Sequence, residues 1–107
     1  MIQIPKLYKE WGIYKIENLI NGKVYIGSSS VLYYRLCRHL STLRKNTHPN
    51  KHLQSAWNIY NESNFSITIL EITIKDKDFL LNREDFYLSY YKSYLRENGY
   101  NIFEKGT

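Results

Sequence analysis

The chain has 107 residues, of which 43% are apolar, so it suits one compact domain with a buried core. No apolar run approaches the roughly 18 residues of a membrane-spanning helix, the N-terminus has no signal-peptide pattern, and the single cysteine, Cys37, excludes an internal disulfide framework. The formal net charge of +5 is one-sided, because no acidic residue lies between Glu17 and Glu62. We therefore expect an intracellular protein (in a bacterial or phage-infected cell, or an organelle matrix) with a polyanionic partner and no membrane partner.

Hydrophobic periodicity and turn residues predict one order of elements along the chain. The patterns predict strands at 12–17 and 23–28, helices at 31–46 and 50–61, a turn at 61–64 and a strand at 65–73. A long helix then begins in the run KDKDF, residues 75–79, and extends to about residue 95, where we expect Asn98-Gly99 to stop it. A short extended piece, YNIF, then closes the chain. The order β-β-α-α-β-α indicates an α+β domain with a small antiparallel sheet.

The first two strands predict a hairpin that carries one tyrosine on each strand. Between Tyr14 and Tyr25 lies Asn21-Gly22, a turn signal. A four-residue loop, 19–22, with Gly22 in the left-handed conformation would pair Ile16 with Tyr25 and make the two phenols diagonal neighbours on one face. Tyrosines also suit strands for packing alone, but the adjacent Gly12 and Gly27 indicate room for close approach of a ligand.

The first predicted helix carries a cation and an imidazole beside its leucine stripe. The stripe consists of Leu32, Leu36, Leu40 and Leu43, and three serines at 28–30 offer N-cap chemistry before it. Arg35 and His39 are four residues apart, so they share one side of the helix at the edge of the core. There an arginine can clamp a phosphate and a histidine can move a proton, although an ordinary boundary pair has the same pattern.

The last predicted helix places a carboxylate among apolar residues. Glu84 shares a helical side with Leu80, Tyr87, Leu88 and Tyr91. A carboxylate there needs a partner or a metal, because an unpaired buried charge is costly. The alternatives are a metal site and a salt bridge to Arg35 or Lys23.

These residues resemble the GIY-YIG nuclease family across 11–103. The similarity rests on an ordered set: Gly12-Ile13-Tyr14, ten residues, Tyr25-Ile26-Gly27, then Arg35, His39, Glu84, and Asn101 in the closing NGYNI. The runs NGKVYIGSS and NGYNI are most similar to the catalytic domains of phage and organellar homing endonucleases. The resemblance implies a three-stranded antiparallel sheet flanked by helices and a metal-dependent DNA endonuclease that leaves 5′-phosphate and 3′-hydroxyl ends.

The same resemblance implies roles for the site residues. Glu84 would hold one divalent ion, for which Mg²⁺ is the first candidate and Mn²⁺ the alternative. Tyr14 would be the general base and Arg35 would stabilise charge on the phosphate, although the choice between the two phenols stays open. His39 and Tyr25 would orient the water and the phenolate or relay a proton, and Asn101 would hold the site together by hydrogen bonding.

DNA would be the partner, contacted through its phosphates. Candidate contacts are Lys23, Ser28, Ser29, Arg38, Arg44 and Lys51. No zinc finger or helix-turn-helix pattern is present, so we expect 1–107 to be a single nuclease domain without a separate DNA-binding domain, and monomeric. Three alternatives stay open: an inactive nucleic-acid-binding module on the same fold, a stand-alone repair or restriction-type nuclease, and a structural basic domain.

Overall fold

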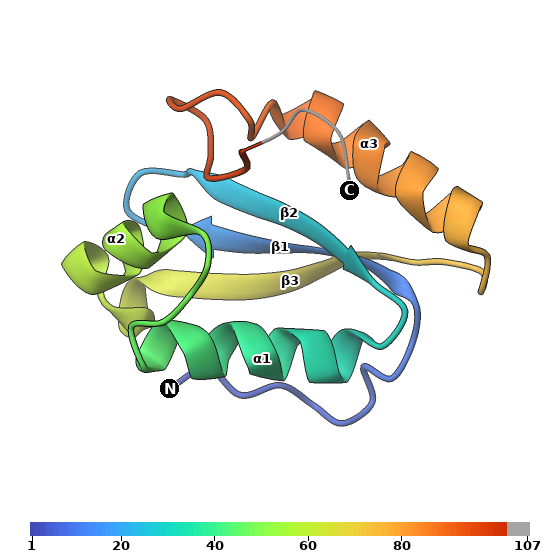
Figure 1. Ribbon diagram of the computed structural model, residues 1–107, viewed down its shortest axis with the longest axis horizontal. Coiled ribbons are helices and arrows are strands. Elements are labelled where there is room, and N and C mark those ends of the chain that lie inside the picture. Colours follow the sequence, from blue (N-terminus) through green and yellow to red (C-terminus); the bar gives the residue numbers. More distant parts are fainter. Residues whose placement is uncertain (103–107) are drawn as a thin grey trace.

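The computed structural model describes residues 1–102 and places a three-stranded sheet between helices on its two faces (Figure 1). β1 (Gly12–Asn18) is the middle strand and pairs antiparallel with β2 (Val24–Ser29) on one side and β3 (Phe65–Ile72) on the other. The predicted α+β order is confirmed. Within this described part, no helix is both long and apolar enough to cross a membrane.

Alternation along β1 and β2 divides the core into two layers. On one face, Tyr14 and Ile16 pack with the buried leucine stripe of α1 (Leu32–Arg44) and with α2 (Lys51–Tyr60). On the other face, Ile13 and Ile26 pack against Leu80 and Leu88 of α3 (Lys77–Tyr91). Successive side chains of a strand point to opposite faces, so side chains from α1 and α3 reach the sheet from opposite sides.

The start of α1 differs from the expectation of a serine cap. Its N-cap residue is Val31, and no side chain caps the helix. Instead, the backbone carbonyls of Tyr8 and Glu10 accept the N–H groups of Tyr33 and Leu32. The N-terminal segment therefore satisfies the open donors of the first turn, which leaves the serines for other partners.

The predictions for 61–64 and for the end of the last helix need correction. The turn is a short 3₁₀ helix, η1 (Glu62–Asn64). α3 ends at Tyr91 rather than near residue 95, because Lys92 adopts a left-handed conformation (φ 49°). The chain then turns back along β2, where Gly99 bridges Val24 in parallel. Asn98-Gly99 therefore does not end the helix, and the predicted extended piece lies partly outside the described residues.

Candidate active site

Tyr14 and Tyr25 lie on the α1 side of the sheet as diagonal neighbours. Ile16 pairs with Tyr25, and Tyr14 pairs with Gly27. The loop between the strands has the predicted four residues, with Gly22 at φ 76°. Both phenol rings lie edge-on against His39, each with ring centroids 5.4 Å apart. The hairpin register therefore brings both hydroxyl-bearing rings to one imidazole.

The space beside Gly12 and Gly27 is filled by other atoms of the protein, so it is not open to a ligand. A Cβ atom at Gly27 would lie 2.4 Å from the Tyr14 hydroxyl oxygen and 2.5 Å from Cζ. A Cβ atom at Gly12 would lie 2.3 Å from the backbone oxygen of Glu71 on β3. The expectation of ligand approach is therefore wrong at both positions, and Gly27 instead determines where the Tyr14 ring can lie.

A chain of hydrogen bonds runs from the backbone of α2's N-cap residue to Tyr14. The N–H of Asn50 donates to Nδ1 of His48 (3.0 Å), His48 Nε2 lies 2.8 Å from His39 Nδ1, and His39 Nε2 lies 2.6 Å from the Tyr14 hydroxyl. A backbone N–H can only donate, so neutral His48 carries its proton on Nε2 and donates to His39. His39 then carries its own proton on Nε2 and donates to the Tyr14 oxygen. The phenol proton of Tyr14 is left free for another acceptor.

The two histidines in this series of hydrogen bonds, His39 and His48, are held neutral. Burial, followed by the charge of Arg35, lowers the pKa of His39 from 6.5 to about 2 and lowers that of His48 as well. Both imidazoles are almost fully buried. His48 was not among the sequence candidates, and its position one residue before Pro49 is the only local signal, because its contact with His39 depends on the turn between α1 and α2.

Arg35 extends from α1 toward both phenols. Burial, followed by the neighbouring Tyr25, raises the pKa of Tyr14, whereas the Arg35 guanidinium lowers it. Burial also raises the pKa of Tyr25, and Arg35 again opposes the shift. Arg35 lines a cavity of about 280 Å³ with residues of α1 and of the loop after it: Arg38, His39, Thr42, Thr47, His48 and Pro49.

Glu84 reaches the same site from α3, on the other side of the sheet. It is half-buried and accepts a hydrogen bond from the Ser28 hydroxyl on β2. Burial raises the pKa of Glu84, and the Ser28 hydrogen bond and Arg35 oppose that shift. The Glu84 charge in turn raises the pKa of Tyr14 and Tyr25, so the four groups act on one another electrostatically. None of the ion pairs within residues 1–102 involves Glu84 or Arg35, so the predicted alternative of a salt bridge is wrong.

The Asn101 side chain makes hydrogen bonds to the backbone of β2 at the edge of that strand that no other strand of the described residues covers. Its side-chain oxygen accepts from the Ile26 N–H (2.8 Å), and its amide donates to the Ile26 carbonyl (2.9 Å). The Ser93 hydroxyl donates to the same oxygen of Asn101 (2.7 Å). The side chain thus bonds β2 as a neighbouring strand would, directly between Tyr25 and Gly27.

A metal at this site would have one protein carboxylate. In residues 1–102, no group of three or more His, Cys, Asp or Glu side chains is arranged to hold an ion. Glu84 alone fits a hard cation that keeps most of its water and takes phosphate oxygens, which is the ordinary behaviour of Mg²⁺.

The candidate phosphate contacts fall into two groups. Arg38 and Lys51 are exposed and Lys23 is partly buried, and none of the three takes part in an ion pair within residues 1–102. The other three have internal partners: Ser28 bonds Glu84, Ser29 bonds the Val31 N–H, and Arg44 pairs with Glu62 at 2.7 Å.

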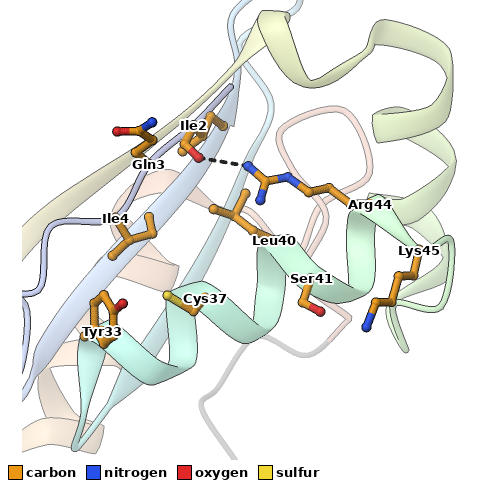
Figure 2. A pocket seen from close by; sticks show the side chains of 9 residues that line it. All are labelled: Ile2, Gln3, Ile4, Tyr33, Cys37, Leu40, Ser41, Arg44 and Lys45. Atoms are coloured by element: carbon orange, nitrogen blue, oxygen red, sulfur yellow. Dashed lines mark hydrogen bonds between the residues drawn. The ribbon is translucent and has the colours of Figure 1, made fainter.

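Arg44 belongs to a second cavity, on the opposite side of α1 from Arg35. Figure 2 shows this cavity of about 530 Å³ between α1 and the N-terminal segment, with Arg44 bonded to the Ile2 carbonyl. Its lining holds apolar side chains such as Ile4 and Leu40 and no acidic group. Because its guanidinium already bonds Glu62 and the Ile2 carbonyl, we leave Arg44 out of the proposed DNA contacts.

Comparisons with known proteins agree with the architecture. The GIY-YIG catalytic domain matches residues 10–101. The chain is 38% identical over 91 residues to intron-associated endonuclease 1 of Enterobacteria phage T4, covering 85% of this chain and 36% of that protein. The structure of the catalytic domain of homing endonuclease I-TevI superposes with a TM-score of 0.79 at 36% identity, covering 88% of this chain and 99% of that one. A mutant of the I-TevI catalytic domain gives the same TM-score and identity over 89% of this chain.

The family match thus extends over nearly all of the described residues, from just before β1 to Asn101. The chain spans about a third of the length of the phage relative. It belongs to the GIY-YIG family of endonucleases.

Proposed function

We propose that this chain is the catalytic domain of a metal-dependent homing endonuclease that hydrolyses DNA phosphodiester bonds. The observation that supports this most directly is that Tyr14, Arg35 and Glu84 act on one another electrostatically. These side chains come from a strand and two helices on opposite faces of the sheet. A purely structural role does not explain why a half-buried guanidinium and a half-buried carboxylate lack an ion pair within residues 1–102.

Arg35 would bind the scissile phosphate in the cavity that it lines. A guanidinium fits two phosphate oxygens at once, and its charge is of most use where negative charge grows on the phosphate. Arg38 lines the same cavity and is exposed, so it would contact the DNA backbone at the mouth.

Tyr14 would act as the general base on the attacking water. His39 donates to its oxygen, and Arg35 lies close to it, so both groups favour the phenolate that burial disfavours. The water oxygen would bond to phosphorus as the bond to the 3′ oxygen breaks, which leaves a 5′-phosphate and a 3′-hydroxyl. Tyr25, edge-on to His39, would orient the water.

Glu84 would hold the divalent ion, Mg²⁺ or, as an alternative, Mn²⁺. When bound, the ion would supply positive charge that polarises the phosphate and stabilises the departing 3′ oxygen. Asn101 and Ser28 would keep β2 and Glu84 in position for this role.

Incubation with supercoiled plasmid and Mg²⁺, followed by end-group analysis, tests the proposal. We expect nicked circles with 5′-phosphate ends, no product in the presence of a chelator, and no product from Glu84→Gln. Lys45→Gln, which removes an exposed charge beside the second cavity, is the matched control and should cut normally. DNA binding without any cutting by the unaltered protein would instead identify an inactive binding module.

A further inference from the structure

A third cavity, of about 410 Å³, lies next to the proposed catalytic pocket and has a basic lining. Lys51 and His52 line it from the start of α2, and Arg96 lines it from the segment after α3. Pro49 lines both this cavity and the one that contains Arg35. The two cavities are therefore neighbours, separated by residues 48–50.

The cations around this third cavity lack the acidic partners that Arg44 and Arg83 have elsewhere in the molecule. Arg44 pairs with Glu62, and Arg83 pairs with Glu71 at 2.8 Å. Neither Lys51 nor Arg96 takes part in an ion pair within residues 1–102, and no acidic residue lines the cavity.

The positive charges also lie close enough together to influence one another. After burial, the charges of Arg96 and Lys23 are the causes that lower the pKa of His52. His52 is held in place by an edge-on contact with the buried Tyr100 ring, with centroids 4.8 Å apart. Two separate segments, the start of α2 and the segment after α3, thus direct positive charge at one cavity, which is how a protein attracts an anion.

We propose that this cavity binds a backbone phosphate of the cleaved DNA strand, next to the scissile phosphate, through Lys51 and Arg96. The inference rests on the proposed nuclease function, because that function places the scissile phosphate beside Arg35. The strand would pass from one cavity to the other over Pro49. Such a contact would position the DNA without reading its sequence.

Binding of a fluorescent DNA duplex, measured in chelator so that no cutting occurs, tests this site. The Lys51→Gln/Arg96→Gln double variant should bind about tenfold more weakly at 0.1 M salt. The negative slope of log K against log salt should become smaller in magnitude by about 1, as expected for the loss of one phosphate contact. The control, Lys6→Gln/Lys45→Gln, removes the same net charge at exposed positions away from both cavities and should retain the slope of the unaltered protein. Equal slopes for the two double variants would overturn the proposal.

A second measurement distinguishes this site from general electrostatic attraction. Once the cut position is mapped, a neutral methylphosphonate is placed at each phosphate flanking it. One of these should weaken binding by the unaltered protein and leave binding by the Lys51→Gln/Arg96→Gln variant unchanged. Equal weakening in both proteins at every position would contradict the proposed strand path. Failure of the nuclease proposal would show as absent cutting by the unaltered protein, whereas the comparison of salt slopes in chelator does not depend on cutting.

Discussion

Replacing Gly27 with alanine should displace the Tyr14 ring. The new Cβ would lie 2.4 Å from the Tyr14 hydroxyl oxygen and 2.5 Å from Cζ, whereas non-bonded atoms settle at about 3.5–4.0 Å, so the ring must move by about 1 Å. The ring is 1% exposed and hydrogen-bonded to His39, so no empty space accepts it. We expect a loss of about 1–3 kcal/mol in the free energy of unfolding from overpacking. The larger effect should be on cutting, because a shift of about 1 Å in a catalytic group costs about 10²-fold in rate.

The assay for Gly27→Ala is the initial rate of plasmid nicking with Mg²⁺, measured beside urea denaturation. Gly22→Asn is the matched control, because a Cβ at Gly22 meets nothing within 4 Å and asparagine tolerates the left-handed conformation of that position. The control should cut at the normal rate. A folded Gly27→Ala protein that also cuts at the normal rate would refute the placement of Tyr14 at the reacting phosphate.

Three further variants test the contacts around the site. The pKa of His39 is lowered from 6.5 to about 2, so below pH 6.5 the unfolded chain takes up a proton that the native protein refuses; stability should fall between pH 7 and pH 5 by about 2 kcal/mol from this residue. Between pH 7 and pH 5, the free energy of unfolding of His39→Gln, measured by urea denaturation, should fall by about 2 kcal/mol less than that of the unaltered protein. Equal decreases in the two proteins would contradict a neutral, buried His39. Asn101→Ala should speed hydrogen exchange at the Ile26 amide and cost about 1–3 kcal/mol in unfolding free energy; unchanged exchange would rule out the edge contact. Arg44→Ala should lower the free energy of unfolding by roughly 0.5–1 kcal/mol through loss of the Glu62 pair, yet leave the salt dependence of DNA binding unchanged. A weaker salt dependence in this variant would show that Arg44 contacts DNA.

The parts of the fold that could be predicted depend on local signals. The Asn21-Gly22 pair and the alternation on each side of it predicted the hairpin, and the requirement that both hydroxyls reach one reacting group selected the four-residue loop that pairs Ile16 with Tyr25. A stripe of leucines with helical spacing was sufficient to predict the buried side of α1. In both cases the turn chemistry and the periodicity agree with the packing, so neither needs knowledge of distant segments.

The parts that could not be predicted depend on contacts between distant segments. α3 ends at a left-handed lysine, and no glycine marks the position. The start of α1 is satisfied by backbone carbonyls from residues 8 and 10, which no side-chain pattern indicates. His48 joins the site only because the chain reverses at Pro49, and Gly27 is required only because the Tyr14 ring crosses it.

The sequence indicated several candidate residues for the site, but not which contacts hold those residues in place. Glu84 and Arg35 were candidates because charged groups at the edge of a core need an explanation. The sequence did not show that Glu84 approaches from the opposite face of the sheet, or that the Ser28 hydroxyl holds it. Both features depend on β2 being an edge strand, which allows side chains from the two faces to meet.

A double-mutant cycle on Tyr14 and Glu84 tests most directly whether these side chains serve one reaction. Nicking rates are measured for Tyr14→Phe, for Glu84→Gln and for the protein with both changes. Each single change should lower the rate by at least about 10²-fold, and the double variant should be no slower than the slower single variant, because groups that act in one step are not additive. Losses that multiply in the double variant, or a single variant that still cuts at the normal rate, would contradict a shared site.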